Sequence, residues 1–201
     1  MIAIIDYGLG NVQAFKDVYS RLNIAATIAK SAEDLNNATK LILPGVGSFD
    51  HAMTKLDESG MRPKIEQLVV ETKTPILGVC VGMQMMATSS EEGKLQGLGW
   101  IDATVKRFDS EKCIVLPHMG WNDVSPKSNS ELFKDMDENI IFYFLHEYYF
   151  DACESSNIEA TSDYGGEFTC SVRKENIFGV QFHPEKSHNF GMLLLKNFAE
   201  I

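Results

Sequence analysis

The stretch ILGVCVGMQ at residues 76–84 decides the fold. A short apolar run leads into Cys80, and glycines stand two residues before and two residues after it. This G-x-C-x-G pattern predicts a strand that turns sharply into a helix and exposes the cysteine at the turn. The helix N-terminus would favour the thiolate, and the N–H of Val81 would face an oxyanion formed on an attacked carbonyl. Cys80 is therefore a candidate nucleophile, against the alternative of a buried structural cysteine.

The first half of the chain alternates between expected strands and expected helices. Apolar runs predict strands at residues 1–6, 25–29, 40–43 (ended by Pro44) and 76–79. Amphipathic or capped segments predict helices at residues 12–22 (behind Asn11 as N-cap), 31–35, 49–56, 63–70 and from 82 to 87. This alternation is typical of an α/β fold with a parallel sheet and helices on both faces.

The second half has strand-like segments that are too closely spaced for a helix in every gap. They lie at residues 101–108, 114–116, 140–145, 158–161, 168–173 and 177–182, and a terminal helix is expected at 190–198. Hairpins are therefore expected, with Gly165 and Gly166 in one of the turns. We predict one domain over residues 1–201, whose mixed sheet is mostly parallel with antiparallel additions in the second half.

Composition excludes several classes of function. Lys and Arg number 18 against 28 Asp and Glu, a formal net charge of −10, which disfavours binding to nucleic acid or an anionic membrane. Apolar runs are too short to span a bilayer, and Asp6 interrupts any secretory leader. Four widely spaced cysteines without a CxxC motif indicate neither a disulfide framework nor zinc. We expect a cytoplasmic protein without a metal or cofactor.

A candidate general base follows the strand at 177–182, in the motif GVQFHPE at residues 179–185. A thiolate needs a nearby imidazole, and the imidazole usually needs a third group to orient it. Pro184 stiffens the backbone between His183 and Glu185, so the carboxylate can hold one imidazole nitrogen while the other faces Cys80. The alternative is a surface His–Glu pair.

The loop LPGVGSF at residues 43–49 is a candidate part of the same site. It follows a first-half strand, at the carboxyl edge where open α/β sheets bind ligands. Its glycines leave backbone N–H groups free to point at a ligand. An N–H of Val46 or Gly47 could complete an oxyanion hole with that of Val81, against the alternative of a plain strand–helix turn.

Together, PGVGSF, GVCVGMQ, PHMGWN and GVQFHPEKS, in this order and spacing, resemble the class I glutamine amidotransferases. DYGLGN near the start and YFLHEYYF at residues 143–150 are similar to the glutaminase subunits of imidazole glycerol phosphate synthases within that family. The resemblance covers the whole chain. It implies a three-layer, flavodoxin-like α/β fold and a Cys80–His183–Glu185 triad. It also implies hydrolysis of L-glutamine through a thioester, with ammonia passed to a cyclase-type β/α-barrel subunit in a heterodimer.

The same resemblance implies which residues bind glutamine: Gly47, Gln84, Glu92, His146, Glu147 and Tyr148. Gln84 lies one helical turn beyond the nucleophile, and Glu92 could hold the α-ammonium group. Glu147 departs from the family, which commonly has a small polar residue there. A carboxylate directed inward would repel the substrate's own carboxylate, so its alternative is to face solvent. The PHMGWN motif at residues 117–122 is expected near the subunit interface or the floor of the site, against a packed Trp with a turn.

Three other functions stay open from the sequence. The first keeps the glutaminase chemistry and supplies ammonia to a surface-polysaccharide sugar amidotransferase. The second is a stand-alone cysteine hydrolase or deglycase with a similar elbow. The third is a non-catalytic scaffold subunit. The Gly8-Leu9-Gly10 turn lacks the third glycine of a dinucleotide fingerprint and carries no nucleotide prediction.

Overall fold

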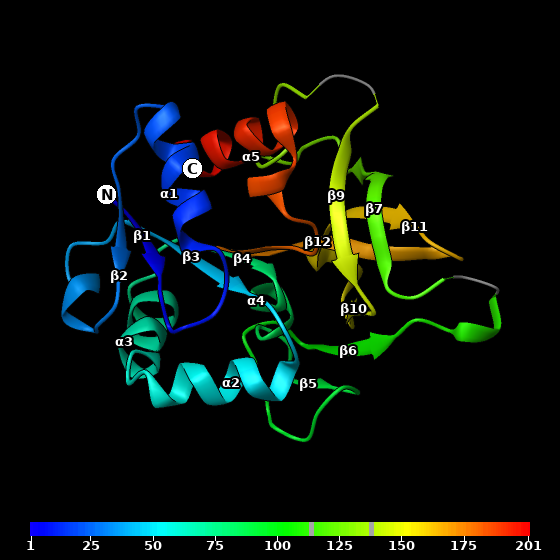
Figure 1. The fold of residues 1–201 in the computed structure, drawn as a ribbon, viewed down its shortest axis with the longest axis horizontal. Helices are drawn as coiled ribbons and strands as arrows, with labels where there is room; N and C mark the ends of the chain where they lie inside the picture. The colour runs from blue at the N-terminus through cyan, green and yellow to red at the C-terminus, as the bar shows by residue number, and fades with distance from the viewer. Residues whose placement is uncertain (113–114, 137–138) are drawn as a thin grey trace.

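Parallel strands form the central part of the molecule (Figure 1). The structure is a computed structural model that describes residues 1–112, 115–136 and 139–201. Its main sheet begins, in spatial order, with β2 (Ala26–Ala29), β1 (Ile2–Ile5), β3 (Lys40–Gly45), β4 (Ile76–Cys80) and β13 (Ile177–Val180). Neighbours in this set are parallel. The parallel half of the predicted sheet is confirmed, and it places the ends of β3, β4 and β13 at one edge.

Antiparallel strands extend the sheet beyond β13, as the second half of the sequence predicts. The order continues with β12 (Glu167–Lys174), β10 (Tyr148–Ala152) and β6 (Ala103–Arg107), each antiparallel to the strand before it. The short outer strand β5 (Ser89–Ser90) then pairs with β6 in parallel. A hairpin turn at residues 164–166 joins β12 to β11 (Ile158–Asp163), which also pairs with β8 (Ser125–Pro126). A separate antiparallel pair consists of β7 (His118–Asp123) and β9 (Ile141–His146).

Helices cover both faces of the parallel strands (Figure 1). One face carries α1 (Val12–Arg21) and α5 (His188–Glu200), and the other carries α2 (Phe49–Glu58) and α3 (Arg62–Glu66). A π-helical turn, Gln67–Glu71, continues α3. The predicted cap of α1 is confirmed, because the Asn11 side chain accepts a hydrogen bond from the N–H of Ala14 at 3.2 Å. Short 3₁₀ turns lie at Glu33–Leu35, Ser110–Lys112, Ser155–Asn157 and Pro184–Lys186.

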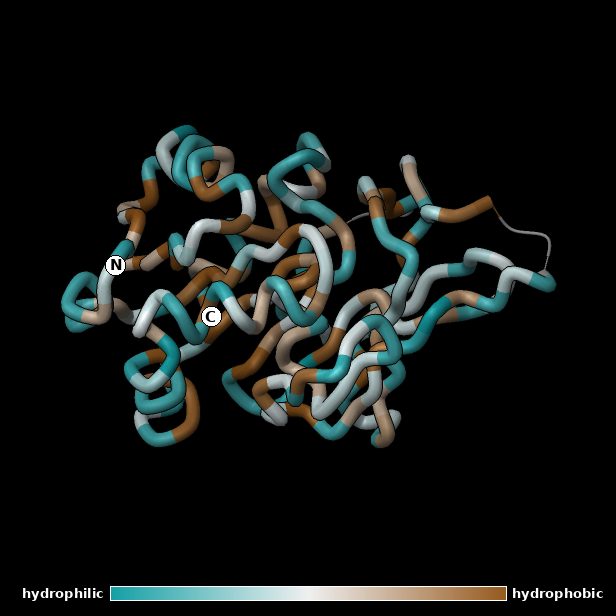
Figure 2. Tube along the Cα trace, turned by 60° about the horizontal axis from the view of Figure 1, so that its bottom comes forward, coloured by the Kyte–Doolittle hydropathy of each residue, from teal (hydrophilic) through white to brown (hydrophobic). Residues whose placement is uncertain are grey.

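Hydrophobic residues follow the central strands, and hydrophilic ones lie on the outer helices and loops (Figure 2). Strand β1 is buried along its whole length, as is β4. Both therefore read as continuous apolar runs, as expected for parallel strands covered on two faces. Within the described residues, no helix has the length and apolar character needed to cross a membrane.

Three local predictions are wrong in part. Pro44 does not end its strand, because β3 continues to Gly45. Pairing between β3 and β1 stops at Ile42. The nitrogen of Pro44 points toward β1 beyond that last pair, so the N–H that proline lacks is not needed for a hydrogen bond between strands. The helix expected at 82–87 is only Val81–Gln84 (α4), followed by turns. The strand expected at 114–116 falls partly outside the described residues, and 115–116 are irregular; the next strand is β7.

Candidate active site

Cys80 lies at the junction between β4 and α4, in the strained turn that its sequence predicts. Its backbone has φ 56° and ψ −116°, a conformation that costs a non-glycine residue about 1–3 kcal/mol and often marks functional sites. The turn brings the backbones of α4 and β3 into contact. A Cβ added to Gly45 would meet the Val81 carbonyl carbon at 2.8 Å, so only glycine fits here.

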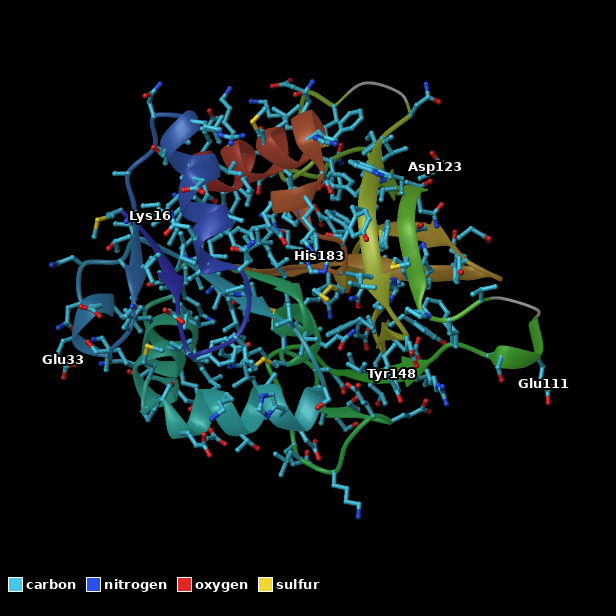
Figure 3. The ribbon with its side chains drawn as sticks, viewed as in Figure 1. Lys16, Glu33, Glu111, Asp123, Tyr148 and His183 are labelled. Carbon is cyan, nitrogen blue, oxygen red and sulfur yellow. The ribbon has the colours of Figure 1, made fainter. Side chains whose placement is uncertain are left out.

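His183 and Glu185 follow β13, the strand next to β4. The imidazole Nδ1 lies 2.9 Å from Glu185 Oε1, and both side chains are almost completely buried. Strand β9 fixes this segment, because the N–H of His183 donates to the Tyr143 carbonyl at 2.9 Å. In Figure 3, His183 lies between the central sheet and β9. His183 and Glu185 therefore form a buried pair in a fixed position. They do not form the surface pair that the sequence left as the alternative.

The electrostatics of His183 connect it to the cysteine. Burial disfavours the charged imidazolium, but hydrogen bonds and charge interactions with Cys80 and Glu185 outweigh it and raise the pKa of His183 to about 10. Since Nδ1 faces Glu185, Nε2 is the nitrogen left for the sulfur. The imidazole is therefore cationic at neutral pH, and it lies between the Glu185 carboxyl group and the Cys80 sulfur.

A cavity of about 360 Å³ opens at this edge of the sheet, and it brings most of the predicted residues together. Its lining includes Val46, Gly47, Cys80, Val81, Gln84, Glu92, His146, Glu147, Tyr148 and His183, with Pro117, Leu145 and Lys186. Every residue named above for the oxyanion hole or for glutamine is present. Among the three triad candidates, Glu185 lies behind His183 and does not line the cavity.

Several of the predicted glutamine-binding residues already form hydrogen bonds within the protein. His146 uses both ring nitrogens, one facing the Tyr148 carbonyl at 2.8 Å and the other facing His118 at 2.9 Å. Both hydrogens of the Gln84 side-chain amide are donated inward, to the Tyr148 carbonyl at 3.1 Å and to Gln181 Oε1 at 2.9 Å. Only its Oε1 remains, so Gln84 can accept from a ligand but cannot donate to one. Glu92 Oε2 accepts from the N–H of Phe49 at 2.8 Å, which caps α2 from a distant loop. Burial, together with Glu147 and Asp50, raises the pKa of Glu92.

Glu147 lines the cavity but does not lie there as an isolated charge. Its Oε2 is 3.4 Å from Arg107 Nη2, and its side chain is partly exposed. The sequence offered two orientations, inward or toward solvent; the structure places Glu147 at the rim, where Arg107 partly neutralises it. Glu92 and Glu147 together make this end of the cavity acidic.

The structure adds two features that the sequence analysis did not assign. Gln181 belongs to the GVQFHPE motif, is fully buried, and its Nε2 lies 3.7 Å from Cys80 Sγ. His118 lies directly opposite His146 in the β7–β9 ladder, and their Nδ1 and Nε2 atoms are 2.9 Å apart. Strand pairing creates both contacts. The identity of the motif could have pointed to Gln181, but no local signal in the sequence pairs two histidines 28 residues apart.

Comparison with known proteins agrees with the site. The chain matches the family described as glutamine amidotransferase class-I over residues 3–201. It is 55% identical to the imidazole glycerol phosphate synthase subunit HisH of Bdellovibrio bacteriovorus, and 50% identical to the subunit of that name from Leptospira interrogans, with full coverage of both chains in each case. It is also 50% identical to subunit HisH 2 of Methanococcus maripaludis, over all of this chain and 99% of the relative.

Solved structures share the fold at lower sequence identity. A crystal structure of a glutamine amidotransferase gives a TM-score of 0.77 at 19% identity, covering 100% of this chain and 99% of the other. The structure of PurLQS from Thermotoga maritima gives 0.75 at 16% identity, covering 99% of this chain and 97% of the other. These likenesses confirm the α/β fold, and the family match and close relatives give its identity. The chain belongs to the class I glutamine amidotransferase family.

Proposed function

We propose that the chain is the glutaminase subunit of an imidazole glycerol phosphate synthase, which hydrolyses L-glutamine to glutamate and ammonia and passes the ammonia to a cyclase subunit. The observation that carries the chemistry is the cavity in which Cys80, on a strained elbow, lies beside the buried His183–Glu185 pair. The names of full-length relatives at 50–55% identity support the pathway over a surface-polysaccharide acceptor.

The residues of the cavity support a two-step mechanism. Cys80 Sγ attacks the side-chain amide carbon of glutamine, and the N–H groups of Val81 and of the Val46–Gly47 turn, three residues that line the cavity, stabilise the oxyanion. His183 gives a proton to the amide nitrogen as the C–N bond breaks, so ammonia leaves and a thioester forms. The neutral imidazole then takes a proton from water, which attacks the thioester and releases glutamate. Glu185 orients the ring throughout.

The polar groups of the cavity give the amino-acid end of glutamine a direction. Glu92 and Glu147 attract a cation, and Gln84 Oε1 accepts hydrogen bonds, so the α-ammonium group belongs at this end. Lys186 and the backbone around Tyr148 remain for the carboxylate. In this assignment Glu147 faces the α-ammonium group, which it attracts. It does not face the α-carboxylate, which it would repel.

The β7–β9 pair supplies the docking surface for the partner, for which we propose a β/α barrel. Register places Met119 opposite Leu145 on the outer face, and Trp121 and Ile141 lie on the same face. All four are large apolar side chains left exposed. Exposed apolar side chains gathered on one face indicate a protein interface. Leu145 also lines the cavity, so a partner on this face would sit beside the site where ammonia is released. We place the complex in the cytoplasm, where Cys80 stays reduced.

Two cysteine variants test the proposal. Cys80→Ala is expected to abolish ammonia release from glutamine, while synthesis from added ammonia by the partner survives. Cys153→Ala is the matched control, because this cysteine is exposed and does not line the cavity. Retained glutaminase activity in Cys80→Ala would overturn the proposed nucleophile. The pathway would be overturned if the chain released ammonia from glutamine at a normal rate but supported no glutamine-dependent synthesis by any imidazole glycerol phosphate-forming partner.

A further inference from the structure

Gln181 lies beside the sulfur of Cys80 because of the register between β4 and β13. Val180 lies opposite Val79, so the next residue of each strand, Gln181 and Cys80, are neighbours as well. We propose that Gln181 is a thiolate-stabilising residue, whose buried side-chain amide donates an N–H to Cys80 Sγ and favours its nucleophilic form. This inference rests on the proposed function of Cys80 as the nucleophile.

Hydrogen-bond chemistry fixes which end of the Gln181 amide faces the sulfur. The Tyr148 carbonyl can only accept, so the Gln84 group facing it at 3.1 Å must be the NH₂. That same NH₂ lies 2.9 Å from Gln181, so the Gln181 atom there must be the oxygen. The NH₂ of Gln181 is therefore left to point at Cys80 Sγ, at 3.7 Å. The opposite orientation would place two NH₂ groups against each other.

A buried chain of side chains holds Tyr148 and Gln84 in this arrangement. His146 Nδ1 lies 2.8 Å from the Tyr148 carbonyl, so it carries the hydrogen. Burial lowers the pKa of His146 to about 3 and that of His118 to about 4, so both rings are neutral at pH 7. His146 Nε2 then accepts from His118 Nδ1, and His118 Nε2 accepts from Asn122 Nδ2 at 3.2 Å. Each N–H of the chain then points at an acceptor, and the second hydrogen of the Asn122 amide goes to the Asp163 carbonyl at 2.8 Å.

The two hydrogen-bond partners of the sulfur favour different protonation states. The Leu145 carbonyl, 3.9 Å from Sγ, can only accept and so suits the thiol. The Gln181 amide can only donate there and so suits the thiolate, as does the cationic His183. Because Gln181 is fully buried, its N–H interacts with the sulfur with little screening by water. Hydrogen bonds from neutral donors to an ionised group are among the stronger ones in proteins.

Three variants of the chain separate the N–H donor from the rest of the network. Gln181→Met removes both the donor and the acceptor while keeping the length. Gln181→Glu keeps an acceptor for Gln84, removes the amide N–H and adds a carboxyl group near the sulfur, so it is compared with Gln181→Met, which adds no charge. Ser171→Ala is the matched control, because Ser171 is fully buried and donates to the Gly179 carbonyl at 2.9 Å in the same strand pair, without reaching the sulfur. His183 and Tyr7, which also interact electrostatically with Cys80, are unchanged in all three.

The readout is the rate of iodoacetamide alkylation across the pH range, followed on the peptide that contains Cys80, beside urea denaturation. Both Gln181 variants are expected to lower the rate at pH 7 by about ten- to a hundred-fold and to move the profile to higher pH. Ser171→Ala is expected to lose stability and keep the profile.

An unchanged profile in Gln181→Met would overturn the inference, as would an equal shift in Ser171→Ala. Because alkylation needs no glutamine, a failure of this inference can be told apart from a failure of the proposed function. Failure of the wild-type chain to release ammonia would overturn that function and leave the measured alkylation effect of Gln181 in place.

Discussion

Replacing Gly82 by alanine tests whether the contact between α4 and β3 sets the position of the nucleophile. A Cβ at this position would lie 2.9 Å from the Leu43 carbonyl carbon and 3.2 Å from that of Pro44, and closer still to the Leu43 oxygen. Carbon atoms in good contact are about 3.5–4.0 Å apart, so the two elements must separate by at least about 0.6 Å. Strand β3 pairs with β4 from Leu41 to Gly45 and with β1 as far as Ile42, so the short helix α4 is the element expected to move.

The expected cost has two parts. Overpacking of this kind lowers the free energy of unfolding by about 1–3 kcal/mol. Because Cys80 is the residue just before α4, the sulfur moves with the helix away from His183 and Gln181. Displacement of a reacting group by about 1 Å can cost about a hundred-fold in rate, so glutaminase activity is expected to fall by at least about tenfold.

Gly60→Ala is the matched control for this prediction. Gly60 has φ 69°, lies in an exposed turn after α2, and has open space around it. Alanine in that left-handed conformation costs about 1–2 kcal/mol without moving the site. Urea denaturation and ammonia release are measured for both variants. Comparable losses of stability with loss of activity only in Gly82→Ala support the reasoning. A folded Gly82→Ala protein with wild-type activity would refute it.

Three further variants give separate outcomes. Glu185→Gln removes a charge that raises the pKa of His183. We expect kcat to fall about ten- to a hundred-fold and the alkaline limb of the pH–rate profile to move to lower pH. An alkaline limb that stays in place would contradict the pairing of His183 with Glu185. His118 is neutral when folded and protonates more readily when unfolded, so wild-type stability is expected to fall as pH drops from about 6.5 toward 4, by at most about 1.4 kcal/mol per pH unit for this group; urea denaturation of His118→Asn should show a shallower fall. Glu92→Gln keeps an acceptor for the N–H of Phe49 but loses the charge for the α-ammonium, so KM for glutamine is expected to rise about tenfold with unfolding unchanged; an unchanged KM would remove Glu92 from the substrate site.

Sequence patterns predicted the parts of this fold that depend on local periodicity. The apolar runs of β1, β3 and β4, the Asn11 cap and the glycines around Cys80 each act within a few residues. The site candidates could be predicted because parallel strands end at one edge, which brings Cys80 and the residues after β13 together. The end of β3 was missed because the effect of Pro44 depends on which neighbouring strand its nitrogen faces.

Other features depend on pairings between distant segments. Strand β7 contains His118, Gly120 and Asn122, a composition with weak strand propensity, and it is stabilised by its ladder with β9. The same ladder creates the His118–His146 contact. The direction of the Gln84 amide follows from a carbonyl 64 residues away. A single sequence shows neither the register nor the tertiary neighbours on which these contacts depend.

The most direct test of the central claim is detection of the covalent intermediate on Cys80. The wild-type chain, with its partner, is mixed with glutamine, quenched in acid and analysed by mass spectrometry of its peptides. A γ-glutamyl group on the peptide that contains Cys80 is predicted, with none on the Cys153 peptide. Cys80→Ala should show no adduct. Ammonia release by the wild-type chain without any adduct on Cys80, or an adduct on another residue, would contradict the account.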